Sequence, residues 1–248
     1  MNSADRGGAF DTIGFSFVGT PGIQLGHNRN IAWGATTNYP DVSDLWSVAI
    51  DGTMVTIGDQ SIEMLQRSEE ILVRDGESIH LTVAEVPGYG VLLPADYIPL
   101  PLAGLGRQLL FNWTGFRPTV EAHVFLDIDR AASIDDFEET VDQFEISAFN
   151  WIAADAEGIT YRCNLLVPDR GDPATSPPAW MMLDGDDPTT FWNGDFLPPE
   201  KLPRSRAQER GWISSANNDP FGFTADGSLE GDPWYFGVFF DPGTRARR

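Results

Sequence analysis

Short β-favouring runs joined by tight turns constrain the fold of this chain most strongly. The run Leu45–Ile50 ends at Asp51-Gly52, a dipeptide that favours a two-residue hairpin turn, and Thr53–Ile57 returns from it. A second turn of the same kind, Asp75-Gly76, lies between two further alternating runs, 66–73 and 78–86. The sequence therefore predicts a β-meander over about residues 45–93.

Strand patterns dominate the rest of the chain as well. Further strands are predicted where short apolar runs are bounded by turn-forming residues: 15–18, 109–114, 149–155, 159–163 and 213–218. One helix is predicted, because Ser133 is a favourable N-cap and apolar side chains recur every three to four residues towards Glu145. Stretches rich in Pro and Gly predict a connection over 92–105 and a long surface loop over 167–204.

The charge balance excludes some classes of partner. The chain has 248 residues, with 37 Asp and Glu against 16 Lys and Arg, so its formal net charge is −21. Nucleic acid and an anionic membrane surface would repel such a protein. We find no apolar run of membrane-spanning length and, in residues 1–8, no apolar segment typical of a signal peptide. The residues themselves therefore predict no membrane or nucleic-acid partner and leave the location open.

Cysteine and histidine offer little chemistry in this sequence. Cys163 is the only cysteine, so an internal disulfide is excluded, and its alternating neighbours predict a half-buried strand residue. His27, His80 and His123 show no metal-ligand spacing, which argues against zinc. The pair His27-Asn28 lies between a turn and a strand, where either a hydrogen-bonded corner or part of a site would fit.

Two acidic stretches could hold a cation or be solvated turns. The stretch 41–44 places Asp41 and Asp44 three residues apart just before a strand, a pattern that suits a hard cation such as calcium. Asp184-Gly185-Asp186-Asp187 is better interpreted as a solvated turn. The chain contains no Gly-x-Ser-x-Gly elbow, P-loop or dinucleotide fingerprint. The residues alone thus predict an acidic, β-rich α+β domain.

A set of short motifs occurs in a specific order and spacing: 19–28, 31–38, 41–45, 113–114, Asn150 with 154–158, 168–170, 211–218 and 243–248. Together they resemble the β-chain of the penicillin acylase family, also called penicillin amidases. The resemblance implies an N-terminal nucleophile hydrolase with a partial αββα sandwich, β-rich with few helices. It implies that residues 1–248 form a single incomplete domain of that sandwich.

The resemblance also implies a mechanism. In this family a serine at the start of the β-chain attacks an amide carbonyl, and its own α-amino group, which titrates near ~8, serves as the base. Preorganised donors stabilise the resulting oxyanion. Carried over residue by residue, the implied oxyanion donors are the backbone N–H of Thr37 and the side chain of Asn150. Arg170 matches a family arginine near the active site; the alternative is that it forms a loop ion pair. The family's calcium loop falls on Asp41, the Ser43 carbonyl and Asp44.

The chain also departs from the family pattern. The Ser-Asn-Asn-like start and the segment after it are not found, and Ser3 lies too close to 19–22 to be the nucleophile. Arg245–Arg248 falls where the family begins a helix. We therefore expect an internal part of an acylase β-subunit, inactive by itself, that partners the remainder of the α/β heterodimer. The expected substrates are N-acyl amides, such as penicillins or acyl-homoserine lactones, and the expected location is periplasmic or secreted.

Two alternatives remain open at the level of the sequence. The first is a non-catalytic, calcium-stabilised binding module that uses loop aromatics as a ligand platform: Trp180, Phe191, Trp192, Trp234, Tyr235 and Phe236. The second is a degenerate pseudoenzyme that pairs with a separately encoded chain. Packing of these aromatics onto the sheet is the simpler use of such residues.

Overall fold

The structure is a computed structural model that describes residues 2–38, 40–94, 106–146, 148–172, 175–177, 181–206 and 211–217. The chain divides into two compact units. The first unit comprises Met1–Asp41, Arg117–Val167 and Phe196–Arg248, and the second comprises Val42–Phe116 and Pro168–Asp195. Within the described residues, no helix is long and apolar enough to cross a membrane.

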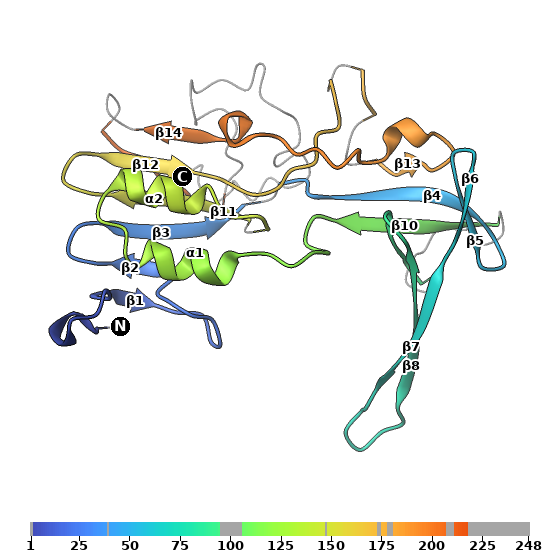
Figure 1. Ribbon diagram of the computed structural model, residues 1–248, viewed down its shortest axis with the longest axis horizontal. Coiled ribbons are helices and arrows are strands. Elements are labelled where there is room, and N and C mark those ends of the chain that lie inside the picture. Colours follow the sequence, from blue (N-terminus) through green and yellow to red (C-terminus); the bar gives the residue numbers. More distant parts are fainter. Residues whose placement is uncertain are drawn as a thin grey trace. The chain divides into compact units, whose positions relative to one another are not determined.

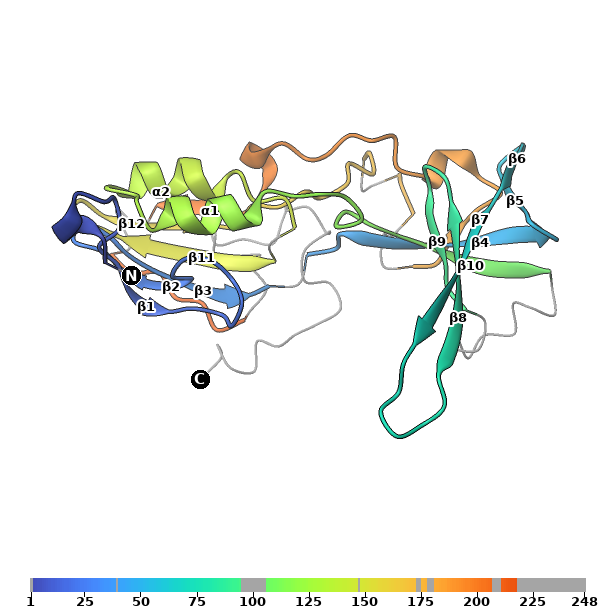
Figure 2. The same ribbon diagram turned by 60° about the horizontal axis from the view of Figure 1, so that its bottom comes forward.

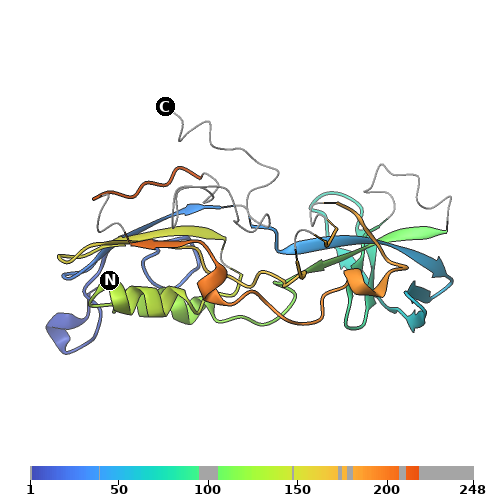
Figure 3. The same cartoon turned by 90° about the horizontal axis from the view of Figure 1, so that it is seen from above.

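The first unit is an antiparallel sheet with helices on one face (Figures 1 and 3). In its described part the strand order is β1-β2-β3-β11-β12-β14. The strands are β1 (Ile13–Phe15), β2 (Leu25–His27), β3 (Ala32–Thr37), β11 (Phe149–Ala154), β12 (Ile159–Arg162) and β14 (Arg204–Arg206). The helices that cover the sheet are α1 (Glu121–Ile128) and α2 (Ile134–Val141), and short 3-10 helices lie at Ala4–Arg6 and Pro199–Lys201.

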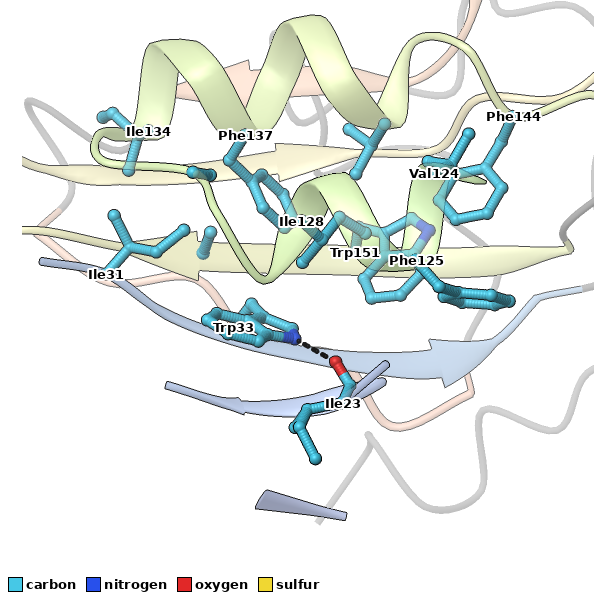
Figure 4. Close-up of a cluster of buried hydrophobic side chains, with 13 residues drawn as sticks. Ile23, Ile31, Trp33, Val124, Phe125, Ile128, Ile134, Phe137, Phe144 and Trp151 are labelled. Carbon is cyan, nitrogen blue, oxygen red and sulfur yellow. Dashed lines mark hydrogen bonds between the residues drawn. The ribbon is translucent and has the colours of Figure 1, made fainter. Parts of the chain in front are cut away.

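Alternate residues of β3 and β11 build the core under the helices (Figure 4). Trp151 is fully buried at its centre, with the Phe144 ring stacked on it at 5.4 Å between ring centroids. Phe137 and Phe149 meet Trp151 edge-on, at 6.1 and 5.4 Å. Trp33 donates its indole N–H to the Ile23 carbonyl at 3.1 Å, which satisfies the polar atom of this buried ring. Because side chains alternate along a strand, the residues between these face away from the helices.

Helix α2 begins as predicted and ends earlier than predicted. The Ser133 hydroxyl accepts a hydrogen bond from the Asp136 N–H at 3.1 Å, so the N-cap is confirmed. The predicted end near Glu145 is wrong, because the helix stops at Val141. Asn164 donates its side-chain amide to the carbonyls of Asp142 and Phe144, at 2.7 and 3.1 Å. These bonds satisfy carbonyls at the end of the helix and allow the chain to turn there.

The second unit is a twisted sheet that contains the predicted meander. The strand order in its described part is β6-β5-β4-β10-β9-β8-β7, with β13 parallel to β4. In Figure 2 the β7–β8 hairpin extends away from the other strands of this sheet. The strands are β4 (Ser43–Asp51), β5 (Met54–Ile57), β6 (Gln60–Glu63), β7 (Leu65–Ile71), β8 (Ile79–Val86), β9 (Gly90–Leu92), β10 (Arg107–Trp113) and β13 (Leu183–Asp184), with a 3-10 helix at Pro188–Thr190.

Two predicted strands are wrong. The strand expected at 15–18 lies at Ile13–Phe15, since the Phe17 N–H bonds to the side chain of buried Gln24 at 2.8 Å and the chain then turns. No strand forms in 211–217, the described part of the stretch around 213–218; instead, the Ser215 and Asn217 side chains bond to β3. Residue 218 and most of the 92–105 connection, from 95 onwards, lie outside the described residues.

Cys163 differs from its predicted setting. It follows β12 rather than lying in it, and it is fully buried rather than half-buried. Asn38 donates its side-chain amide to the sulfur at 2.7 Å, and burial raises the pKa of the Cys163 thiol to about 12. The thiol is therefore neutral at ordinary pH and is a poor nucleophile.

Candidate active site

Asn150 and Thr37 lie on neighbouring strands of the first unit. In the β3–β11 pair, Asn150 is opposite Thr36 and Phe149 is opposite Thr37. Asn150 is only 1% exposed, and its Nδ2 donates to the Thr36 hydroxyl at 3.2 Å. The side chains of Asn150 and Thr36 share the sheet face that is turned away from the helices. The fold thus places the two implied oxyanion donors in consecutive register positions.

The ladder pattern decides where the Thr37 N–H points. Asn38 donates its backbone N–H to the Ala148 carbonyl at 2.9 Å, so these two residues form a hydrogen-bonded pair. The next pair of an antiparallel ladder, Thr37 with Phe149, is then a non-hydrogen-bonded pair. The N–H and C=O of Thr37 consequently point away from β11. On that side the Thr37 carbonyl accepts from the Asn217 side-chain amide at 3.0 Å.

Two cavities of the first unit border these donors. One, of about 360 Å³, is lined by Asn150, Thr36 and Ser215 together with residues of β3 and β11. The other, of about 200 Å³, is lined by Thr37 and Asn217 among other residues. Thr36 lines both cavities. A carbonyl oxygen bound in this region would meet polar donors on an otherwise largely apolar sheet face.

A chain of polar side chains surrounds Asn150. Its Oδ1 accepts a hydrogen bond from the Tyr161 hydroxyl at 2.6 Å, and the Thr36 hydroxyl is within hydrogen-bonding distance of the Ser215 hydroxyl. The sequence did not single out Tyr161, Thr36 or Ser215 as site residues. Strand alternation could have found Tyr161, because it lies opposite Ile152, two residues beyond Asn150 on the same face.

Arg170 lies in the second unit, where it pairs with Asp44. Its Nε donates to Asp44 Oδ2 at 2.8 Å, and the two side chains are 6% and 0% exposed. The Trp192 indole N–H donates to the same oxygen. Asp44 Oδ1 is buried with no hydrogen-bond partner among the described residues. The loop ion pair considered for Arg170 is therefore present, whereas Asn150 and Thr37 belong to the other unit.

The residues of the expected calcium loop are divided between the two units. Ser43 and Asp44 begin β4, opposite Trp113 and Asn112, and Asp41 is the last residue of the first unit's N-terminal segment. Within the described ranges, no group of three or more His, Cys, Asp or Glu side chains could hold a metal ion. The buried Asp44 Oδ1 is an oxygen that suits a hard cation, whereas Asp44 Oδ2 already accepts from Arg170 and Trp192.

The loop aromatics pack within the second unit as far as they are described. Phe191 stacks on Trp46 at 4.8 Å between ring centroids, and Trp192 meets Trp46 edge-on at 6.1 Å. Both rings are thus partly buried and pack against the core that contains Trp46. The other aromatics of the expected ligand platform lie outside the described residues: Trp180, Trp234, Tyr235 and Phe236.

The His27-Asn28 pair forms a hydrogen-bonded corner. The Asn28 side-chain oxygen accepts from the N–H groups of Asn30 and Ile31 at 2.8 and 2.9 Å, and its amide donates to the Ala131 carbonyl at 2.7 Å. His27 itself is exposed. Asn28 thereby ties the β2–β3 turn to the segment between the helices, which is a structural role.

Comparison with known proteins agrees with the resemblance. The penicillin amidase family model matches residues 3–248. The chain belongs to the penicillin amidase family. Among curated members it is 27% identical to penicillin G acylase of Escherichia coli over 225 residues, which is 87% of this chain and 24% of that protein. It is 23% identical to the acyl-homoserine lactone acylase QuiP of Pseudomonas aeruginosa, over 86% of this chain and 26% of that protein.

A solved structure of the penicillin amidase family has the same fold. The thermostable penicillin G acylase from Alcaligenes faecalis matches with a TM-score of 0.73 and 21% identity, over 90% of this chain and 39% of that chain. The predicted fold class, a β-rich, partial αββα sandwich with few helices, is confirmed. The chain spans about a quarter of the length of the curated relatives that it matches.

Proposed function

We propose that this chain supplies the oxyanion-stabilising side of an acylase that cleaves N-acyl amide bonds, with penicillin-type or acyl-homoserine-lactone-type compounds as substrates. The observation that carries the proposal is the placement of Asn150. Its carboxamide is buried, is held at both ends and borders a cavity, and the Thr37 N–H lies one register position away and points off β11. Asn150 and Thr37 border two different cavities, and Thr36 lines both; fixed donors of this kind are what a developing oxyanion requires.

The proposed reaction is acyl transfer to an N-terminal serine. The serine hydroxyl attacks the amide carbonyl, its α-amino group takes the proton, and the carbonyl oxygen becomes negatively charged. The Thr37 N–H and Asn150 Nδ2 donate to this oxygen. The attacking serine is proposed to come from the remainder of the acylase α/β heterodimer, so the chain by itself is proposed to be inactive. Location in the periplasm or outside the cell remains a proposal taken from the resemblance.

The test is the turnover of a chromogenic N-acyl amide by the acylase that contains this chain. Asn150→Ala removes one oxyanion donor and should lower kcat by about 10²- to 10³-fold. Asn164→Ala is the matched control, because this buried asparagine caps the end of α2 and touches neither cavity. It should lower the thermal midpoint and leave kcat unchanged. An Asn150→Ala enzyme that is folded and fully active would refute the proposal.

A thiol variant separates this mechanism from one that uses cysteine. Cys163→Ala should retain turnover, because burial raises the pKa of the thiol to about 12 and leaves it uncharged. Loss of turnover in Cys163→Ala together with an active Asn150→Ala enzyme would require a different nucleophile and a different oxyanion site.

Calcium binding by Asp41, the Ser43 carbonyl and Asp44 is also a proposal. Its support is the donor set, two carboxylates and a carbonyl, together with the buried Asp44 Oδ1 that lacks a partner among the described residues. Bound calcium would act structurally, by neutralising charge at the start of β4. Calcium titration should raise the thermal midpoint and EDTA should reverse the rise. If millimolar calcium leaves the thermal midpoint unchanged both in the wild-type chain and in Asp41→Asn, the site is excluded.

A further inference from the structure

The orientation of the Asn150 carboxamide is fixed from two sides. The Tyr161 hydroxyl donates to Oδ1 at 2.6 Å, and Nδ2 donates to the Thr36 hydroxyl at 3.2 Å. Asn150 and Tyr161 are each 1% exposed, so bulk water does not compete for these bonds. A carboxamide carries its acceptor on one end and its two N–H groups on the other. Binding Oδ1 to a hydroxyl donor therefore determines where the N–H groups point.

Orientation matters because the two ends of the carboxamide have opposite effects on an anion. With Nδ2 towards Thr36, the amide presents donors on the side of the cavity that Thr36 and Asn150 line. After a flip, the carbonyl oxygen of the same side chain would face that cavity and repel a negative charge. The Thr36 and Tyr161 hydroxyls can each donate or accept a hydrogen bond. A phenol is the stronger donor and the weaker acceptor of the two, because its oxygen lone pair is delocalised into the ring. The Tyr161 hydroxyl therefore favours the orientation in which it donates to Oδ1, as it does here.

Tyr161 is itself held in place by the opposite face of its strand. Arg162, the next residue, points towards α2 and forms an ion pair with Glu138. Arg206 on the neighbouring strand β14 also donates to Glu138, with 2.6 Å between Nε and Oε1. These bonds attach β12 and β14 to the helix layer. The phenol of Tyr161 therefore projects from a strand that is anchored on its other side, as a group that orients a catalytic side chain requires.

We propose that Tyr161 is a positioning residue for Asn150: its hydroxyl fixes the carboxamide so that Nδ2, and not Oδ1, faces the oxyanion. The inference rests on the proposed function, because it assigns Asn150 to the oxyanion. It adds a residue that acts through Asn150 and does not touch the substrate. Preorganisation of this kind stabilises the transition state more than the bound substrate, so it should affect kcat and leave KM nearly unchanged.

The kinetic test is a double-mutant cycle in the assembled acylase. Tyr161→Phe removes only the hydroxyl and should lower kcat on the order of 5- to 10-fold, the effect of losing one neutral hydrogen bond. KM should stay within about twofold. Tyr161→Phe combined with Asn150→Ala should be no slower than Asn150→Ala alone, because the hydroxyl then has nothing to orient. Tyr89→Phe, which removes a phenol hydroxyl from the second unit, is the matched control and should leave kcat unchanged.

The outcomes separate this inference from the proposed function. An unchanged kcat in Tyr161→Phe, with Asn150→Ala strongly impaired, would overturn the positioning role alone. So would a double variant that is slower than Asn150→Ala by the full Tyr161→Phe factor. An unimpaired Asn150→Ala enzyme would overturn the proposed function and remove the basis for this inference.

A second measurement does not depend on turnover. In the full chain, the two side-chain amide protons of Asn150 can be followed by NMR and assigned by comparison with Asn150→Ala. Tyr161→Phe should accelerate their hydrogen exchange and shift their resonances, while Tyr89→Phe should do neither. Identical exchange and shifts in the wild-type and Tyr161→Phe chains would overturn the proposed contact.

Discussion

Replacing Arg170 by methionine tests the buried ion pair of the second unit. Both side chains of the Arg170–Asp44 pair are almost completely buried, and after the substitution Trp192 is the only donor to Asp44 Oδ2 among the described residues. Removing one partner of a buried pair leaves an uncompensated charge and typically costs about 3–5 kcal/mol. Methionine roughly preserves the apolar volume of the arginine stem, so the loss should come mainly from the charge.

Thermal unfolding measures this cost. For a chain of this length, 1 kcal/mol corresponds to about 2–4 °C, so Arg170→Met should lower the midpoint by on the order of 10 °C. The Trp192 indole bonds to Asp44 and meets the Trp46 ring edge-on, so near-UV circular dichroism reports on the affected unit. Asp44→Leu should cost a similar amount. The double variant should lose clearly less than the sum of the two, because it leaves neither charge unpaired.

Two results would refute this reasoning. The first is an Arg170→Met midpoint within about 2 °C of the wild type. The second is a double variant whose loss equals the sum of the single losses, which would mean that the two groups do not interact. A loss of kcat at an unchanged midpoint would instead favour the alternative from the family resemblance, an arginine that acts at the active site.

Two further predictions concern the first unit. Trp151→Ala should destabilise it by about 3–5 kcal/mol, because the indole is fully buried among Phe144, Phe137 and Phe149; a denaturant midpoint close to that of the wild type would contradict this. Burial raises the pKa of Asp129 from 3.8 to about 6, so folding favours its protonated form. The free energy of unfolding should therefore fall as pH rises from about 4 to 6, relative to Asp129→Asn, and parallel pH profiles of the two chains would contradict this.

Local signals predicted the elements whose ends are set locally. Ser133 and the acidic residues after it determine where α2 begins, so its start could be predicted. Its end depends on Asn164, which approaches from beyond β12 and leaves no local mark. Helix α1 was not predicted, because Val120 precedes it without a side-chain cap and no N-cap signal marks its start. A helix that is held by packing on Trp151 and Phe144 rather than by its caps is difficult to find from a single sequence.

The site residues also differ in how far the sequence could predict them. Asn150 and Thr37 were proposed from the family resemblance, and spacing in the sequence gave no reason to join them. The position of Tyr161 follows from the β11–β12 register once the turn at Asp155 is fixed. The Asp155 carboxylate fixes that turn, because it accepts hydrogen bonds from the N–H groups of Glu157 and Gly158. The Arg170–Asp44 contact could not be predicted, because 126 residues separate the two in sequence.

The site inherits its geometry from the packing on the other face of the same sheet. Trp151 points into the helix-covered core, so its neighbour Asn150 must point to the opposite face, and Thr36 lies opposite Asn150 there. A slip of one residue between β3 and β11 would turn the carboxamide into the apolar core and the indole out of it. Burial of an indole among three phenylalanines strongly disfavours that slip. The same hydrophobic packing that stabilises the first unit therefore holds the proposed oxyanion donor on the face that borders the cavity.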